Sequence, residues 1–191
     1  MKDDKITKNN IENVKKNKFT TELISWLKAI LFALVLSFLI TKFIIVNAQV
    51  PTPSMVNTIN VNDRFIANRL SYLFNDPERY DIVVFKYPDD ESKLYVKRII
   101  GLPGETVEII DGKVYIDGSL KPLRDDFLPE PMNKEDFGPY KVPEESYFML
   151  GDNRNYSEDS RYWENKFVSK DKILGKAVFK YFPKIELLTD K

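Results

Sequence analysis

The sequence predicts a mainly β protein in which a single N-terminal transmembrane helix is followed by an antiparallel β domain with a small inserted β hairpin region. An apolar stretch at residues 23–46 has the length of a membrane span. After it, short apolar runs alternate with turn residues, and no long amphipathic helix pattern occurs. The 191 residues suffice for one modest domain with appendages.

The charge distribution divides the chain into three parts. We expect a cytoplasmic tail at 1–22, a transmembrane anchor at 23–46 and an extracytoplasmic β-rich domain at 47–191. Residues 1–28 carry seven lysines and four carboxylates, a net charge of 7 − 4 = +3. Because positively charged flanks stay on the cytoplasmic side of a span, we expect a single-pass cell-membrane protein with a cytoplasmic N-terminus. The lipid bilayer is therefore an expected partner.

Two lysines interrupt the apolar stretch, at Lys28 and Lys42. The charge-free part between them is too short to cross about 30 Å of hydrocarbon at about 1.5 Å per residue. If both lysines extend toward opposite interfaces, the whole stretch is long enough. Two other interpretations remain open: a signal peptide removed near the small-residue run Val46-Asn47-Ala48, or a buried helix of a soluble core.

The region after residue 47 is predicted to consist of short strands. Asp111-Gly112 lies between two β-prone runs, which is a strong hairpin signal. The inserted region is expected at 105–143, where residues 121–143 contain five prolines and are predicted to form an irregular surface excursion. The apolar runs that predict strands are 64–67, 82–85, 94–100, 107–110, 114–116, 147–150 and 177–182.

The composition excludes several kinds of chemistry. The chain has no histidine and no cysteine, so a Ser-His-Asp triad, a Cys-His pair and disulfides are impossible, and the usual zinc ligands are missing. We expect no metal site and no cofactor. The 29 basic and 29 acidic residues balance, which gives no electrostatic case for a nucleic-acid partner.

A candidate nucleophile is Ser54, in the run Val50-Pro51-Thr52-Pro53-Ser54-Met55. The two prolines fix two φ angles and remove two backbone donors, so the turn can hold the hydroxyl in an exposed pose. Thr52 could place a second hydroxyl beside it. The alternative is that the run is a plain linker leaving the membrane.

A candidate base is Lys97, in the strand-like run 94–100. Neighbouring side chains of a strand point to opposite faces, so we expect either Lys97 or Arg98 to be partly buried. Burial lowers the pKa of a lysine and allows a neutral amine, whereas arginine stays protonated. A solvated lysine on an edge strand is the alternative.

A third candidate feature is the loop 151–161, which combines two arginines with three carboxylates. Such density predicts an ordered, hydrogen-bonded loop at the end of a strand, in which a hydroxyl could position a lysine amine. The carboxylate spacing does not fit an EF-hand calcium loop, and a solvated turn remains the alternative.

Taken together, these segments resemble the bacterial type I signal peptidases, or leader peptidases, of the short form with one membrane anchor. The matching segments are 51–55, 62–68, 80–85, 95–104 and 151–161. The resemblance implies a membrane-bound serine endopeptidase with a Ser-Lys dyad, which removes N-terminal signal peptides from exported preproteins. Its β domain would be the catalytic domain.

The resemblance also implies a role for each matching residue. Ser54 would attack the scissile carbonyl and Lys97 would take its proton, while the Ser54 N–H and the Thr52 hydroxyl would form the oxyanion hole. The residues implied to orient the lysine and support its loop are Ser157, Asp159 and Arg161. The residues implied to line the substrate pocket are Val50, Met55, Ile59 and Val96.

The chain departs from the family pattern at Asn57, where a proline is usual, at Tyr80, where a glycine is usual, and at Tyr156, where a small polar residue is common. These departures leave open a catalytically inactive membrane-anchored β-domain that acts as a binding or assembly module. A soluble self-cleaving Ser-Lys repressor is a further alternative, but it requires a DNA-binding region that the sequence lacks. If the chain is an active peptidase, self-cleavage near Ala48 is a related hypothesis.

Overall fold

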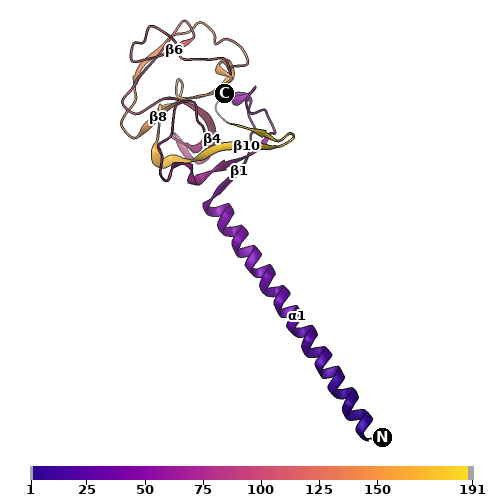
Figure 1. Cartoon of the computed structure of the whole chain (residues 1–191). Helices are drawn as coiled ribbons and strands as arrows, with labels where there is room; N and C mark the ends of the chain where they lie inside the picture. The colour runs from indigo at the N-terminus through magenta and orange to yellow at the C-terminus, as the bar shows by residue number, and fades with distance from the viewer. Residues whose placement is uncertain (1, 189–191) are drawn as a thin grey trace. The chain divides into compact units, whose positions relative to one another are not determined.

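The computed structural model describes residues 2–188, and these divide between Lys42 and Phe43 into two compact units (Figure 1). The first unit is built by helix α1 (Lys2–Phe43). Its part Lys18–Phe43, 26 residues, is long and apolar enough to cross a membrane. At about 1.5 Å per residue this part exceeds the roughly 30 Å of a hydrocarbon core.

The helix ends three residues before the expected anchor boundary, because Ile45 and Val46 already belong to strand β1. Val46, Asn47 and Ala48 pair with residues of β2 in antiparallel register. A cut after Ala48 would therefore remove most of an ordered strand.

The second unit is mainly antiparallel β, as the sequence predicts. The strands are β1 (Ile45–Gln49), β2 (Arg64–Asn68), β3 (Ile82–Tyr87), β4 (Asp90–Gly101), β5 (Thr106–Ile110), β6 (Lys113–Ile116), β7 (Phe137–Lys141), β8 (Ser146–Leu150), β9 (Phe167–Ser169), β10 (Ile173–Phe182) and β11 (Glu186–Leu187). Short 3-10 turns lie between them: η1 (Pro53–Met55), η2 (Arg69–Tyr72), η3 (Arg154–Tyr156) and η4 (Lys170–Lys172).

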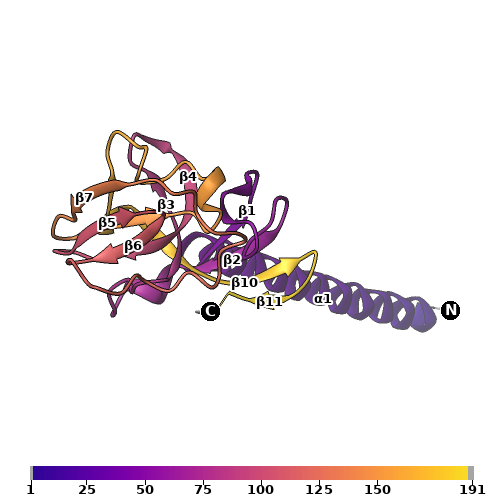
Figure 2. The same cartoon turned by 90° about the horizontal axis from the view of Figure 1, so that it is seen from above.

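Within residues 2–188 the strands form two sheets. The larger sheet has the order β1-β2-β10-β3-β4-β8-β9, with β11 beside β10. The smaller sheet has the order β6-β5-β7 and forms the inserted region, where β5, β6 and β7 lie side by side (Figure 2). The predicted hairpin is confirmed, since Asp111 and Gly112 adopt φ angles of 51° and 76° and Ile110 pairs with Lys113.

All seven strands predicted from the apolar runs are present, but four others are not predicted by the pattern: β1, β7, β9 and β11. The prediction of an irregular surface excursion at 121–143 is wrong in two respects. The segment contains β7, and its Phe127 and Met132 are buried at 5% and 7% exposure. Through these two buried side chains the segment packs against the rest of the domain.

Three hydrophobic clusters hold the β domain together, and each serves a different part. The first packs β1, η1, β2 and β10; the second joins the small sheet to β8; the third packs β3, β4 and β8 against Trp163. Strand β4 contributes to the second and third clusters and has Val96 packed against the first. This central strand carries Lys97.

Candidate active site

The turn η1 places Ser54 in the wall of a cavity. Pro53 begins the turn, where a fixed φ and a missing N–H carry no penalty. Behind the serine, the Asn153 N–H donates to the Ser54 carbonyl at 3.0 Å, and the Asn153 side-chain amide donates to the Pro53 carbonyl at 3.2 Å. The backbone of the turn is thus held by the loop that follows β8, and Ser54 itself is only 6% exposed.

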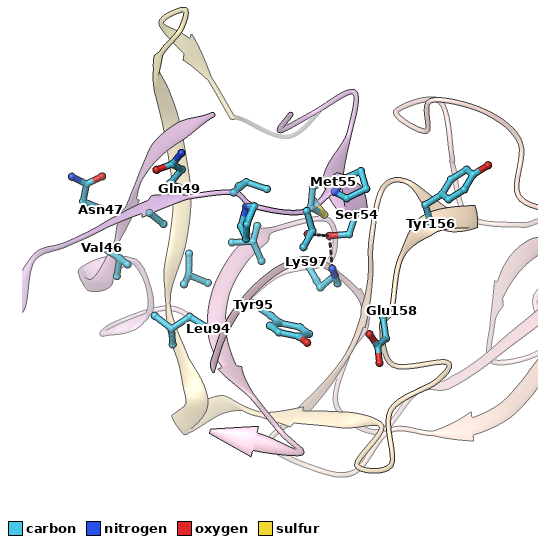
Figure 3. Close-up of a pocket in the computed structure, with 17 residues that line it drawn as sticks. Val46, Asn47, Gln49, Ser54, Met55, Leu94, Tyr95, Lys97, Tyr156 and Glu158 are labelled. Carbon is cyan, nitrogen blue, oxygen red and sulfur yellow. Dashed lines mark hydrogen bonds between the residues drawn. The ribbon is translucent and has the colours of Figure 1, made fainter. Parts of the chain in front are cut away.

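Lys97 meets this serine from β4. Its Nζ donates to Ser54 Oγ at 2.6 Å, and the side chain is 4% exposed (Figure 3). Burial lowers the pKa of Lys97 from 10.5 to about 8, although the nearby carboxylates of Asp159, Asp152 and Glu158 act in the opposite direction. A substantial fraction of the amine is therefore neutral at slightly alkaline pH.

The sequence predicts that either Lys97 or Arg98 is partly buried, and in the structure both side chains are buried. Strand β4 lies between β3 and β8 inside the larger sheet, and at Arg98, which is 2% exposed, both of its edges are paired. The guanidinium is neutralised by Asp152 in a bidentate pair, with Nε–Oδ1 at 2.8 Å and Nη2–Oδ2 at 2.7 Å. Lys97 has no such carboxylate partner among residues 18–188, and its amine contacts the serine instead.

The Thr52 hydroxyl lies 3.3 Å from Ser54 Oγ. Thr52 has extended backbone angles, φ −120° and ψ 155°, and immediately precedes the 3-10 turn. The first N–H groups of such a turn have no acceptor within it. The Thr52 hydroxyl and the Ser54 N–H can therefore serve together as donors to an anion beside Ser54 Oγ.

The loop after β8 supports the Ser54–Lys97 pair in a different way from the one that the family resemblance implies. Ser157 Oγ is buried, but it forms no hydrogen bond with Lys97 or with any other described residue. Asp159 and Arg161 do pair: Arg161 Nε donates to Oδ1 at 2.7 Å and Nη2 to Oδ2 at 2.9 Å, both side chains being almost fully buried. Asp159 also accepts from the Gly151 N–H at 3.0 Å and thereby closes the loop.

A cavity of about 540 Å³ extends along the Ser54–Lys97 pair. Of the four predicted pocket residues, Val50, Met55 and Val96 line it, whereas Ile59 does not. Ile59 is fully buried in the first hydrophobic cluster with Val50 and Met55. It therefore supports the wall of the cavity from behind.

Several residues of the site carry no role in the sequence interpretation. Asp152 and Asn153 stand in the quoted loop 151–161, but composition alone does not reveal that one pairs with Arg98 and the other holds the serine turn. Strand β1 also lines the cavity and is missed because its residues continue the apolar anchor pattern. Alternating small and polar residues at 46–49 are the signal that could have indicated a strand.

Two of the three departures from the family pattern have a structural explanation in the backbone. Asn57 has a φ of 83°, which a proline cannot adopt, and its side-chain amide donates to the Phe127 carbonyl at 3.0 Å. Tyr80 has a φ of 74°, a region where glycine is free of strain. Its ring packs edge-on against Phe127 with centroids 5.9 Å apart, a contact that a glycine could not make.

Comparison with known proteins gives consistent matches. A family model described as "Signal peptidase, peptidase S26" matches residues 23–182. Signal peptidase I of Leptolyngbya laminosa is 39% identical over 174 residues, covering 87% of this chain and 83% of that protein. Signal peptidase I S of Bacillus subtilis (strain 168) is 38% identical over 182 residues, covering 90% and 94%. A crystal structure of a signal peptidase I from Enterococcus faecalis V583 is 37% identical, with a TM-score of 0.46, covering 53% of this chain and 97% of that one.

Proposed function

The chain belongs to the signal peptidase family, peptidase S26, and we propose that Ser54 and Lys97 are the dyad with which it removes signal peptides from exported preproteins. It is a membrane-anchored serine endopeptidase. The observation that carries the residue assignment is the 2.6 Å contact between a buried amine and a buried hydroxyl. Nothing supports the inactive binding or assembly module.

The proposed reaction begins with neutral Lys97. Its lone pair accepts the Ser54 proton as Oγ attacks the scissile carbonyl carbon, which becomes a tetrahedral oxyanion. In this proposal the Ser54 N–H and the Thr52 hydroxyl stabilise the oxyanion, and the 3.3 Å distance between Thr52 Oγ1 and Ser54 Oγ supports the role of the threonine. Losing one such donor costs about 3–4 kcal/mol in comparable sites.

Collapse of the intermediate completes the two halves of hydrolysis. The Lys97 ammonium gives its proton to the leaving amine, which becomes the N-terminus of the mature protein, and the signal peptide stays on Ser54 as an ester. The neutral amine then takes a proton from water, and the hydroxide attacks the ester. Ser54 regains its proton as the signal peptide leaves with a carboxyl terminus. No metal or cofactor takes part in these steps.

The cavity walls support an extended peptide as substrate. Strand β1 pairs with β2 along one edge only, and β4 pairs with β8 only from Arg98 onward, so residues 94–97 have one unpaired edge. Both segments line the cavity. An extended peptide can add to unpaired strand edges through backbone hydrogen bonds, while the apolar walls at Val50, Met55 and Val96 restrict the side chains beside the cut.

We also propose the division and orientation expected from the sequence: a cytoplasmic tail at 1–22, a bilayer-spanning anchor at 23–46 and an extracytoplasmic peptidase domain at 47–191. The net positive charge before the span supports this orientation. Contact with lipid outside the span is supported by the turn η2, whose Arg69 N–H donates to the Ile44 carbonyl at 2.8 Å. The following side chains, Leu73 and Phe74, are 62% and 92% exposed and apolar.

The dyad is tested with the full chain in detergent and a purified preprotein. Ser54→Ala and Lys97→Ala should each abolish cleavage while thermal unfolding stays cooperative. Thr52→Val should lower kcat about 10²- to 10³-fold. Ser119→Ala changes an exposed serine outside the cavity and should cleave like the wild type. Wild-type cleavage by either alanine variant of the dyad would refute the assignment.

The orientation is tested with single cysteines, because the chain has none of its own. The cells are treated so that the reagent reaches the outer face of the cell membrane while this membrane stays intact. A membrane-impermeant maleimide should then label Ser119→Cys. It should label Thr7→Cys only after the membrane is broken. The reverse pattern would overturn the proposed orientation.

A further inference from the structure

Two exposed side chains stand at the cavity beside the dyad and are not used in the reaction. Among the described residues that line the cavity, the charged side chains are Lys97 and Glu158. Glu158 is exposed, and its carboxylate forms no hydrogen bond or ion pair with any described residue. Tyr156, which also lines the cavity, is 71% exposed. Both groups are therefore available to a bound peptide.

Tyr156 and Glu158 flank Ser157 in the loop after β8, and both line the cavity. The 3-10 turn η3 ends at Tyr156, and Ser157 after it is extended, with φ −116° and ψ 123°. The Tyr156 ring and the Glu158 carboxylate leave this segment in different directions (Figure 3). Ser157 and Asp159 are buried, and Asp159 is fixed by Arg161. Tyr156 and Glu158 thus project from a rigid segment rather than from a free loop.

The position of the two residues assigns them to one half of the substrate. They lie on one side of the Ser54–Lys97 pair, while Asn47 and Gln49 of β1 lie on the other (Figure 3). The β1 side offers unpaired strand edges and apolar walls, which suit the small and apolar end of a signal peptide. The substrate residues that follow the scissile bond would then lie on the side of Tyr156 and Glu158.

We infer that Tyr156 and Glu158 form a subsite for the first residues of the mature chain, which favours basic and disfavours acidic side chains there. The inference rests on Ser54 as the nucleophile. A unit charge about 4 Å from an exposed carboxylate changes binding about fivefold in water. A basic side chain can also lie over the Tyr156 ring in a cation–π contact. Lys and Glu at the same substrate position should thus differ by roughly five- to twenty-fivefold.

The experiment measures kcat/KM of the full-length enzyme in detergent for preprotein variants. Each variant carries Lys, Gln or Glu at the first, second or third residue of the mature part. The readout is the Lys:Glu ratio within one enzyme form, so any change in the basicity of Lys97 cancels. Wild type should show a ratio well above one at one or more of these positions.

Substitutions at the subsite should change this ratio in a defined order. Glu158→Gln should bring it close to one, and Glu158→Lys should invert it. Tyr156→Leu should lower the Lys:Gln ratio while keeping an apolar surface. Glu164→Gln removes an exposed carboxylate outside the cavity and should leave the ratio as in wild type.

Two results would overturn the inference: equal Lys:Glu ratios for wild type and Glu158→Gln at all three positions, or a Glu158-dependent ratio found only for residues before the cut. Either result leaves the proposed function intact, because the enzyme still cleaves. Failure of the wild type to cleave any variant would instead count against the proposed function.

Discussion

The N–H of Asn153 donates to the carbonyl of Ser54 at 3.0 Å, joining the loop after β8 to the turn of the nucleophile. Close packing at Gly151 makes this contact possible. A Cβ at Gly151 would lie 2.5 Å from the Ser54 carbonyl oxygen and 2.2 Å from Ser157 Oγ. The position of the serine turn therefore depends on the absence of a side chain at Gly151, which seven strands separate from Ser54 in the sequence.

Gly151→Ala should impair catalysis more than folding. The new methyl must push the serine turn away from the loop, and a misplacement of about 1 Å can cost on the order of 10²-fold in rate. We expect kcat to fall at least tenfold with a smaller change in KM, measured by steady-state cleavage of a preprotein.

Gly118→Ala is the matched control for that substitution. Gly118 has a φ of 67° and no atom within 4 Å of an added Cβ, so the change strains a turn far from the site. This variant should lose some stability and keep its kcat. Normal kcat in Gly151→Ala would contradict the proposed role of the close packing.

The cleavage rate should depend on pH through Lys97. Because the pKa of this buried amine is lowered to about 8, kcat/KM should rise about tenfold per pH unit below pH 8 and level off above it. Glu158→Gln should shift this limb to lower pH, since the Glu158 carboxylate raises the pKa of Lys97. Lys97→Arg should be inactive at every pH, because arginine stays protonated.

The pH profile is measured with one preprotein from pH 6 to 10 in full-length enzyme. The folded fraction is measured at each pH in parallel, so that a lower cleavage rate is not mistaken for unfolding of the enzyme. A profile that is flat over this range, or a limb near the ordinary lysine value of 10.5, would contradict a neutral amine base.

The parts of the site that could be predicted are those set by local chemistry. Ser54 directly follows a run with two prolines that favours a turn, and Lys97 lies in an apolar strand, so each can be identified from its neighbours in sequence. The strands read from apolar runs are present for the same reason. The contacts that Ser54 and Arg98 make with Asn153 and Asp152 cannot be predicted in this way, because these partners come from the loop after β8, far away in the sequence.

Two features, strand β1 and the orientation of the Ser157 hydroxyl, cannot be predicted from the sequence, each for a physical reason. Strand β1 continues the apolar composition of the anchor, and only its pairing with β2 separates strand from helix. Ser157 was expected to bond Lys97, yet its hydroxyl faces Gly151 and has no hydrogen-bond partner among the described residues. Rotamer choices of this kind depend on packing that no local pattern encodes.

Lys97→Met should stabilise the fold at neutral pH. A lysine with a lowered pKa binds its proton more weakly in the folded than in the unfolded chain, so protonated Lys97 opposes folding below pH 8. The shift of 10.5 − 8 = 2.5 units corresponds to about 3 kcal/mol at most. The gain should be full below pH 8 and vanish as the pH rises to 10.5.

This stability difference is measured by denaturant unfolding of the full chain in detergent, followed by the fluorescence of Trp163, which is 2% exposed. Ser54→Ala serves as a second inactive variant that keeps the lysine, and it should not show the gain. Equal stability of Lys97→Met and wild type at pH 7 would show that the buried amine carries no cost.

The Arg98–Asp152 pair should behave as a coupled unit. Both side chains are at most 2% exposed, so removing one partner leaves a buried charge. Arg98→Met and Asp152→Leu should each cost about 3–5 kcal/mol, whereas the double variant should cost clearly less than their sum. A double-mutant cycle of unfolding free energies measures this coupling, and additive losses would contradict it.

Asn57→Pro should destabilise the protein, although proline is usual at this position in the family that the sequence resembles. Proline fixes φ near −65°, while Asn57 has a φ of 83° and donates its side-chain amide to Phe127. The turn after Met55 must then rebuild, at a cost of about 1–3 kcal/mol. Asn57→Gly keeps the backbone angle and loses only the hydrogen bond, so its loss should be smaller. Thermal unfolding of the three forms should give the order wild type, Asn57→Gly, Asn57→Pro, and a proline variant as stable as wild type would contradict the left-handed turn.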